Sequence, residues 1–319
     1  MNVIVTGANG FVGSAVCNQL LDEGYDVYAV LRNESSDITR LSVSDSLHFL
    51  YCDMDHYREL PEKLAGREYK VLYHFAWTGS AGPLRGDENV QLDNIRNSCD
   101  LIRSCEKLNC HRFVFASSIM EYEINAAMAA DGKIGINTIY STAKMTADYM
   151  LRAIAGSLGI DYIRGVISNI YGPGEKSPRL INTSLRKLLT GEHCAFSAGE
   201  QFYDFIYISD AAKEFTAIGR KGINNHTYYI GSLNPKPLKE FLCEMRDQVD
   251  PNIEIGLGEI PFNGISLSYK EFDIEAVKND TGYEPETTFA EGIQKTVDWI
   301  RKDIMNSNTS VRKSGGGAD

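Results

Sequence analysis

The stretch Val3-Ile-Val-Thr-Gly-Ala-Asn-Gly-Phe-Val-Gly13 decides the fold of this chain. Its apolar start, Val3 to Thr6, predicts a buried strand, and a helix is predicted to follow. Between them three glycines repeat at a G-x-x-G-x-x-G spacing, and glycine lets the backbone turn sharply and approach a ligand closely. Because free N–H groups at a helix N-terminus bind phosphate, this turn is typical of a dinucleotide site. A plain tight turn is the alternative, which the position directly after the first strand disfavours.

The pattern of this stretch repeats through the first half of the chain, where short apolar strands alternate with helical segments. Strand followed by helix, repeated, predicts an α/β fold: a doubly wound parallel sheet of the Rossmann type with helices on both faces. The predicted strands after the first are Asp26 to Leu31, Leu47 to Cys52, Val71 to Ala76, Phe113 to Ser117 and Tyr162 to Ser168.

A second, smaller α+β region is predicted after the breaker Tyr171-Gly-Pro-Gly174. Phe205 to Ile208 and Thr227 to Ile230 have strand patterns that could return to the main sheet, so the boundary is interleaved. We therefore expect a dinucleotide-binding domain at 1–172, with returns near 205–231, and a substrate domain at 173–204 and 232–303. Little apolar content after residue 305 predicts a disordered tail at 306–319.

Composition narrows the class of protein. The 319 residues are 43% hydrophobic, which supports a full core, and the net charge of −11 would repel a nucleic acid. No apolar run reaches the roughly 20 residues that a membrane helix needs. Seven cysteines without a C-x-x-C pair indicate reduced thiols and no metal site. We expect a soluble, cytoplasmic protein that binds neither nucleic acid nor membrane.

Tyr140 and Lys144 lie four residues apart in a predicted helix, so their side chains share one face. A neighbouring ammonium favours the phenolate, which lowers the pKa of a tyrosine toward neutrality. Tyr140 would then exchange a proton with a carbonyl or alcohol oxygen while a nicotinamide carries hydride. Ser118, at the end of the preceding strand, would hold the same oxygen by a hydrogen bond.

The end of the second strand predicts the cofactor. An acidic residue there typically binds the ribose of NAD, whereas arginine accommodates the extra phosphate of NADP. Here the residue is Arg32, which favours NADP(H) and leaves NAD(H) as the alternative. Asp53, just after the third strand, is a candidate partner for the adenine amino group.

Taken together, the motifs resemble the extended short-chain dehydrogenase/reductase family, its nucleotide-sugar epimerases, dehydratases and reductases. The resemblance covers about residues 1 to 303. It implies a doubly wound cofactor domain and a cleft toward a nucleotide-sugar domain. The motifs that carry it are the glycine turn, His74-Phe-Ala76, Asn94, Ser117-Ser118, Tyr140-Ser-Thr-Ala-Lys144, Asn169-Ile-Tyr-Gly-Pro-Gly174, Asp204-Phe-Ile-Tyr-Ile-Ser-Asp210 and Gly282-Tyr-Glu-Pro285. The cofactor-binding residues that follow from the motifs and the resemblance are Gly7, Asn9, Gly10, Phe11, Val12, Gly13, Arg32, Asp53, Met54, Phe75, Ala76, Asn94, Ser117, Tyr140, Lys144, Ile167, Asn169 and Ile170.

Two departures from the family pattern bear on the activity. Sugar 4,6-dehydratases of the family carry an acidic residue one or two positions after the catalytic Ser or Thr, where this chain has Ile119 and Met120. Glu121 comes one position later and would face differently on an extended segment. The family often has Arg before the later Asp-Phe, to bind diphosphate, where this chain has Tyr203. The expected substrate-binding residues are Ser80, Ser118, Glu121, Tyr140, Asn169, Arg179 and Tyr203, with Arg186 and Lys187 as further diphosphate candidates.

Three functions remain open from the sequence. A 4-ketoreductase of a nucleotide sugar fits Arg32 best, a 4-epimerase with retained NAD is the first alternative, and an NADP(H)-binding sensor without turnover is the second. The resemblance also implies a homodimer, because the family commonly pairs the helices around 90–108 and 140–157 into a four-helix bundle.

Overall fold

A computed structural model of the chain describes residues 1–129, 135–136 and 138–314, without the side chains of 125, 127–129 and 307–314. A seven-stranded sheet dominates it, with the strand order β11-β6-β5-β4-β1-β2-β3 and every neighbouring pair parallel. The order reverses direction beside β1, which is the doubly wound arrangement that the alternating strands and helices predict. The strands are β1 (Asn2–Thr6), β2 (Asp26–Leu31), β3 (Leu47–Tyr51), β4 (Val71–His74), β5 (Arg112–Ser118), β6 (Asp161–Ile167) and β11 (His226–Ile230).

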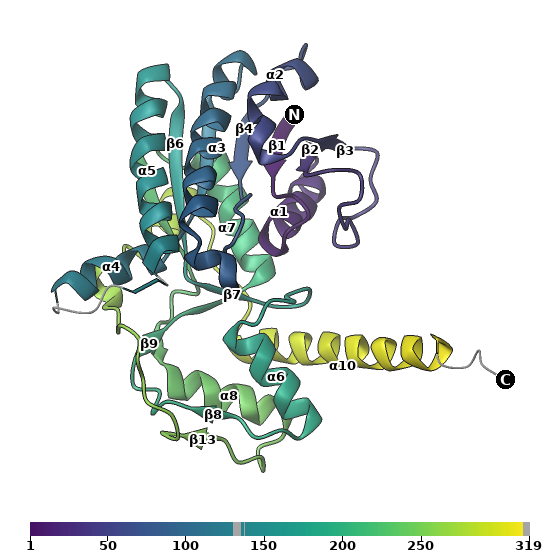
Figure 1. Ribbon diagram of the computed structural model, residues 1–319, viewed down its shortest axis with the longest axis vertical. Helices are drawn as coiled ribbons and strands as arrows, with labels where there is room; N and C mark the ends of the chain where they lie inside the picture. Colours follow the sequence, from purple (N-terminus) through teal and green to yellow (C-terminus); the bar gives the residue numbers. More distant parts are fainter. Residues whose placement is uncertain (130–134, 137, 315–319) are drawn as a thin grey trace.

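Helices cover both faces of this sheet. Alternate residues of β1 enter two different apolar clusters, Val3 and Val5 on one face and Ile4 on the other. α1 (Phe11–Asp22) packs beside α7 (Ile208–Lys221) on the first face, and α3 (Glu88–Lys107) packs beside α5 (Thr138–Leu158) on the second (Figure 1). Short elements complete this half: a 3-10 helix Met54–Glu59, α2 (Leu60–Lys63), a 3-10 helix Pro83–Gly86, α4 (Met120–Ala129) and α9 (Ala276–Thr281).

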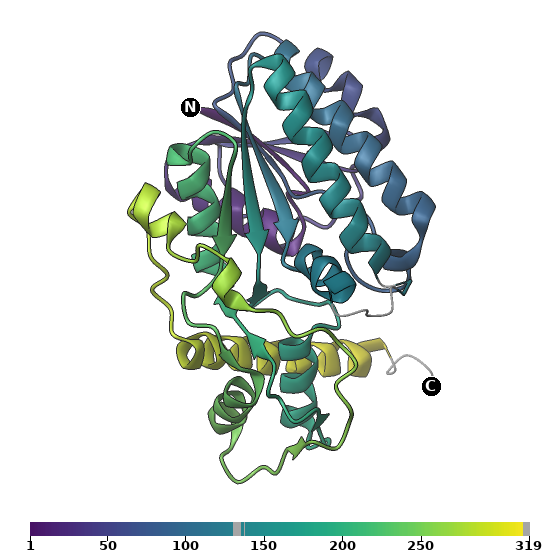
Figure 2. The same ribbon diagram turned by 90° about the vertical axis from the view of Figure 1, so that its left-hand side faces the viewer.

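A smaller unit lies beyond the end of the sheet toward which the strand arrows point (Figure 2). It combines helices with three two-stranded sheets: β7 with β10, β9 with β12, and β8 with β13. Its elements are β7 (Asn169–Tyr171), α6 (Leu180–Thr190), β8 (Ala195–Phe196), β9 (Phe202–Tyr203), β10 (Phe205–Tyr207), β12 (Lys236–Pro237), α8 (Leu238–Val249), β13 (Gly256–Leu257), a 3-10 helix Tyr269–Glu271 and α10 (Phe289–Ser314).

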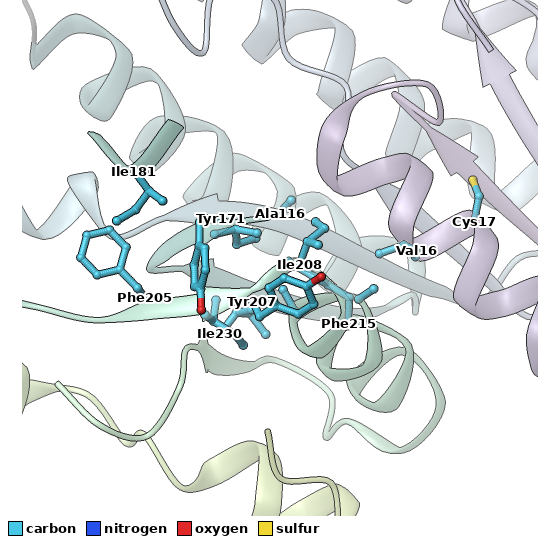
Figure 3. Close-up of a cluster of buried hydrophobic side chains, with 14 of the residues drawn as sticks. Val16, Cys17, Ala116, Tyr171, Ile181, Phe205, Tyr207, Ile208, Phe215 and Ile230 are labelled. Carbon is cyan, nitrogen blue, oxygen red and sulfur yellow. The ribbon is translucent and has the colours of Figure 1, made fainter. Parts of the chain in front are cut away.

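One apolar cluster joins the two units. It runs from Val16 of α1 through Phe215 of α7 to Tyr171, Phe205 and Ile181 of the smaller unit (Figure 3). Because buried apolar area is the main favourable term in folding, a shared cluster of this kind stabilises both units together and holds the space between them in shape.

Two predictions about the second half need correction. Of the two predicted strands, β11 returns to the main sheet, whereas β10 pairs in parallel with β7, which lies outside that sheet. Part of the stretch predicted to be disordered, 306–314, continues α10 as far as Ser314, because each residue added to an existing helix gains a backbone hydrogen bond, and 315–319 lie outside the described residues. Within the described part of the chain, no helix is long and apolar enough to cross a membrane.

Candidate active site

A cavity of about 730 Å³ lies over the carboxyl ends of β1, β2 and β4. Ligands of open parallel sheets bind at this edge, where the strand order reverses. Of the residues predicted to bind the cofactor, the cavity is lined by Gly7, Asn9, Gly10, Phe11, Val12, Gly13, Arg32, Asp53, Met54, Phe75, Ala76, Ser117, Tyr140, Lys144, Ile167 and Ile170. Asn94 and Asn169 do not line it.

The glycine turn has no room for side chains. Gly7 has a φ of 65°, and a Cβ on it would stand 2.6 Å from the Ala76 nitrogen. A Cβ on Gly13 would stand 2.2 Å from the Gly7 carbonyl oxygen. The turn therefore packs backbone against backbone, leaving the N-terminus of α1 open for a phosphate. This cradle fits the pyrophosphate of a dinucleotide.

The end of β2 carries the features expected for the adenosine ribose. The Arg32 side chain is 60% exposed, and its Nε lies 3.7 Å from a carboxylate oxygen of Asp53. Arg40 and Lys176 line the same cavity, as do Ser35 and Ser36. Arg40 holds the rim together by donating to the carbonyl oxygens of Gly174 and Asn9. The two cations and the two serines were not predicted, because they come from loops without a regular pattern.

The predicted catalytic groups come together at the end of β5. Tyr140 and Lys144 lie on one face of α5, both are buried, and Ser118 ends β5 beside them. Burial raises the pKa of Tyr140, while a hydrogen bond with Ser118 and the charges of Arg179 and Arg85 oppose the rise. The net effect is a raised pKa, because burial outweighs the polar and cationic groups that favour the phenolate, and the lowering predicted from the sequence is not found in the protein alone.

Lys144 sits in an aromatic and carbonyl cage. Its Nζ donates to the Ala116 carbonyl oxygen at 2.8 Å and lies 3.8 Å from the Trp77 ring centroid and 4.8 Å from that of Phe115. Burial lowers the pKa of Lys144 to about 7, and the charge of Glu121 opposes this effect. The π faces and the carbonyl oxygen stabilise the ammonium form of Lys144.

Glu121 does not face the substrate, contrary to the prediction. It is buried beneath the site, where it accepts hydrogen bonds from the Ser117 hydroxyl and the Ser118 backbone and forms an ion pair with Arg164. Burial raises its pKa, and the Arg164 charge opposes the rise. The segment after Ser118 is not extended as expected: α4 begins at Met120 and turns the carboxylate back under β5. Glu121 therefore supports the serines and does not line either cavity.

A second cavity of about 710 Å³ continues from the first toward the smaller unit. The two share a wall that includes Tyr140, so a ligand in one meets a ligand in the other at the phenol. Ser80, Ser118, Tyr140, Asn169, Arg179 and Tyr203 of the expected substrate residues line this second cavity.

The remaining predicted cations differ in their surroundings. The Arg179 side chain is 48% exposed and pairs with Glu175 at 3.7 Å. Lys187 lines the second cavity, whereas Arg186 pairs with Asp303 on α10 at 2.7 Å and is not among its lining residues.

Two buried amides on α3 hold the loop between β4 and α3. Asn94 accepts from the Thr78 nitrogen and donates to its oxygen at 2.9 and 2.8 Å, and Gln91 donates to the Leu84 oxygen at 3.0 Å. The structure thus places Asn94 behind the loop, and Asn94 lines neither of the two cavities described above. Among the described residues, no group of three His, Cys, Asp or Glu could hold a metal ion.

The family model described as "NAD dependent epimerase/dehydratase family" matches residues 3–231. The chain belongs to this family. It is an enzyme of the short-chain dehydrogenase/reductase type, with the Rossmann-like sheet of that group.

Curated relatives align with this chain over nearly its whole length and over nearly the whole of their own. dTDP-glucose 4,6-dehydratase 1 of Escherichia coli K12 is 25% identical, over 94% of this chain and 92% of its own length. A putative UDP-glucose 4-epimerase of Methanocaldococcus jannaschii is 24% identical, over 94% and 98%. The relatives thus differ in reaction while sharing the family.

Solved structures confirm the fold. A UDP-N-acetylglucosamine 4-epimerase from Methanobrevibacter ruminantium M1, in complex with UDP-N-acetylmuramic acid, superposes with a TM-score of 0.80 at 24% identity and covers 95% of this chain and 98% of its own. The Bordetella bronchiseptica enzyme WbmF, in complex with NADH, does so with a TM-score of 0.78 at 20% identity, over 98% and 95%.

Proposed function

We propose that this enzyme reduces the 4-keto group of a nucleotide-linked sugar with NADPH. The observation that carries the proposal is Arg32, which stands at the end of β2 in the cofactor cavity where a carboxylate favours NAD. The second cavity, which meets the first at Tyr140, is the proposed place of the sugar nucleotide. The relatives named for dTDP- and UDP-sugars support this substrate class.

The surroundings of Arg32 support a 2′-phosphate. Its guanidinium is mostly exposed and Asp53 approaches it only at 3.7 Å, so the side chain can turn toward a phosphate. Ser35 and Ser36 add hydroxyl donors, and Lys176 adds a second charge. Several solved structures of similar proteins contain NAD or NADH. The proposed use of NADPH would therefore distinguish this chain from them.

The side chains of the site supply the proton chemistry. The bound cofactor would deliver hydride to the carbonyl carbon. Tyr140 would donate its phenolic proton to the carbonyl oxygen, so that a secondary alcohol forms, and Ser118 would hold that oxygen by a hydrogen bond. Lys144 would bind the cofactor ribose and lower the cost of the phenolate left behind. The Trp77 and Phe115 rings cover that ammonium, which is itself buried.

Dehydration is not proposed, although dehydratases are among the relatives. Elimination of water needs an acid and a base at the sugar, and the positions after Ser118 that line the cavity are Ile119 and Met120. The nearby carboxylate, Glu121, is already paired with Arg164 and bonded to Ser117. Its use as a proton donor would cost the buried Arg164 guanidinium the nearer of its two carboxylate partners and leave only Asp148, at 3.6 Å.

The 4-epimerase remains the second candidate, because several solved relatives are named as epimerases and the same Tyr140 could oxidise and re-reduce one sugar. It predicts NAD that stays bound through the reaction. A sensor without turnover is disfavoured by the buried and adjacent Tyr140 and Lys144, which a binding function alone does not need.

The decisive experiment identifies the cofactor. The purified protein is denatured, released nucleotide is identified by mass spectrometry, and stripped protein is titrated with NADPH and NADH. An empty site that prefers NADPH, together with NADPH oxidation by 4-keto nucleotide sugars, supports the reductase. Stoichiometric NAD with conversion of a 4-hydroxy sugar to its epimer would replace it by the epimerase.

We also propose that the enzyme is a homodimer through α3 and α5. These helices pack side by side and expose Leu92 (56%), Tyr149 (67%) and Met150 (48%) to solvent. Large apolar side chains grouped on two parallel helices favour burial against a second copy. A monomeric mass in solution scattering would contradict the dimer.

A further inference from the structure

The loop between β4 and α3 brings one arginine into the substrate cavity that no motif predicts. Arg85 lines the second cavity together with Ser118 and Tyr140. The centre of its guanidinium lies 4.6 Å from the centroid of the Tyr140 ring. Arg85 is thus beside the group that exchanges the proton.

The guanidinium has donors to spare. Its Nε and Nη2 are buried and hydrogen-bond to no group of the described residues. A buried donor without a partner costs free energy, and the cost is greater for a charged group. The π face of Tyr140 offsets part of the charge but accepts no strong hydrogen bond. The Nε–H and Nη2–H groups of Arg85 therefore lack an acceptor, and an oxygen atom of a bound ligand would supply one.

The backbone under Arg85 is held rigidly. Gln91, which is buried, donates to the carbonyl oxygen of Leu84, the residue before Arg85. The same amide donates to Gly79, and Asn94 clamps Thr78 at the start of the loop. A donor on a clamped loop loses little conformational entropy when a ligand binds, which favours selective recognition.

The neighbouring charges leave the acceptor role to the ligand. Glu123 is the nearby carboxyl group that feels the Arg85 charge, and burial raises the pKa of Glu123 to about 7 against that influence. No ion pair joins the two side chains among the described contacts. Among the described residues, Glu123 therefore leaves the Nε–H and Nη2–H groups of Arg85 without an acceptor.

We infer that Arg85 determines sugar specificity by donating hydrogen bonds to an oxygen substituent on C3 or C6 of the sugar at whose C4 Tyr140 acts. The inference rests on the proposed function, because it takes the second cavity to hold a nucleotide sugar. The shared chemistry is an oxygen acceptor, either a hydroxyl on C3 or a hydroxyl or carboxylate on C6. The carboxylate would gain most, since a guanidinium fork matches its two oxygens.

Calorimetry on cofactor-saturated protein tests the inference without turnover. Wild type, Arg85→Gln and Arg85→Lys are titrated with a nucleoside diphosphate and with its xylose, glucose and glucuronate conjugates. The nucleotide is whichever of UDP, dTDP or CDP binds wild type. Arg85→Gln is expected to bind the free diphosphate normally and to lose about 10- to 100-fold in affinity for sugar conjugates. Arg85→Lys should recover part of the loss.

The three sugars locate the contact. A loss limited to glucose and glucuronate places it at C6, and a loss common to all three places it at C3. Arg67→Gln is the matched control, because Arg67 also stacks on a tyrosine, Tyr28, at 5.5 Å but is exposed and lines neither cavity. The control should bind every ligand like wild type.

The inference and the proposed function fail differently. Unchanged sugar binding by Arg85→Gln, or an equal loss for the free diphosphate, would overturn the role of Arg85 and leave NADPH-dependent reduction standing. A sugar-specific loss in a protein that retains NAD and epimerises its substrate would support Arg85 and overturn the reductase. Sugar conjugates that bind wild type no better than the free diphosphate would also overturn the role of Arg85.

Discussion

The first cavity, proposed to hold the cofactor, and the second cavity, proposed to hold the substrate, are similar in size but are built in different ways. They are called the cofactor cavity and the substrate cavity below. The first includes turns that follow regular strands, such as Gly7–Gly10 after β1 and Asp53 after β3. The second draws on segments from residue 80 to residue 296, few of which belong to a repeating unit. A local sequence motif can therefore form a cofactor site, whereas the shape of a substrate pocket depends on how distant segments pack.

Tyr140 stands where the two cavities meet, and its removal has the largest expected effect. Tyr140→Phe removes the proton and little volume, so turnover should fall by about 1,000-fold with cofactor binding kept. Steady-state kinetics and cofactor titration check this. Tyr149→Phe, on the same helix but 67% exposed, is the control. Near-normal turnover by Tyr140→Phe would break the proposed mechanism.

The glycine turn should tolerate no side chain. Gly13→Ala would place a Cβ 2.2 Å from the Gly7 oxygen, and we expect an affinity for the cofactor that is weaker by about 100-fold. Fluorescence titration measures it. Gly156→Ala in α5 is a matched control, since nothing lies within 4 Å of the added Cβ. If both variants bind alike, the turn does not hold the pyrophosphate.

Arg32 tests the adenosine end of the cofactor cavity. Arg32→Ala is expected to weaken NADPH by about 10- to 50-fold and NADH by much less, because only NADPH has a phosphate to lose. Arg58→Ala, whose side chain is 76% exposed and pairs with Asp100, controls for the lost charge. Equal losses for both cofactors would show that Arg32 does not bind the phosphate.

Lys144 tests whether the catalytic cage costs stability. Burial lowers the pKa of Lys144 from 10.5 to about 7. Below pH 7 the side chain is therefore charged in both states, and its burial lowers the free energy of unfolding by the full amount. Between about pH 7 and 10.5 the folded protein is neutral at this site and the unfolded chain is charged. Folding then releases a proton, which becomes easier as pH rises, so the destabilisation disappears near pH 10.5. Lys144→Met should therefore melt roughly 5 °C higher than wild type near pH 6.5, without cofactor, and the gain should shrink toward pH 10.

Thermal unfolding across this pH range measures the effect. Lys107→Met, an exposed lysine at the end of α3, is expected to change little at any pH. A Lys144→Met protein that is less stable than wild type at pH 6.5 would mean that the cage stabilises the ammonium by more than burial costs.

The smallest effect is expected in the substrate cavity. Arg179→Ala removes a half-exposed cation that is already paired with Glu175, so the KM for substrate should rise only about threefold. Arg186→Ala, about two turns further along α6 and paired with Asp303, should leave KM unchanged. A large rise in KM for Arg179→Ala would mean that one residue supplies most of the binding free energy in the substrate cavity. The substrate cavity would then resemble the cofactor cavity, whose binding depends on a local motif.

The sequence by itself determined the elements that depend on local patterns. The alternation of strands and helices predicted the parallel sheet, and the spacing of Tyr140 and Lys144 placed both on one face of α5. The glycine turn and Arg32 were found at the strand ends where they were expected. Each follows from backbone geometry within one strand–turn–helix unit, which no distant contact can easily change.

Only the tertiary structure decided which side chains face the cavities. Glu121 was expected at the substrate and lies beneath it, because a helix begins at Met120 and Arg164, from the next strand, draws the carboxylate inward. Arg85 was not predicted, since its place over Tyr140 depends on Gln91 holding a loop without a regular pattern. Both outcomes depend on long-range hydrogen bonds and charges, whose energies arise between segments that the linear pattern does not bring together.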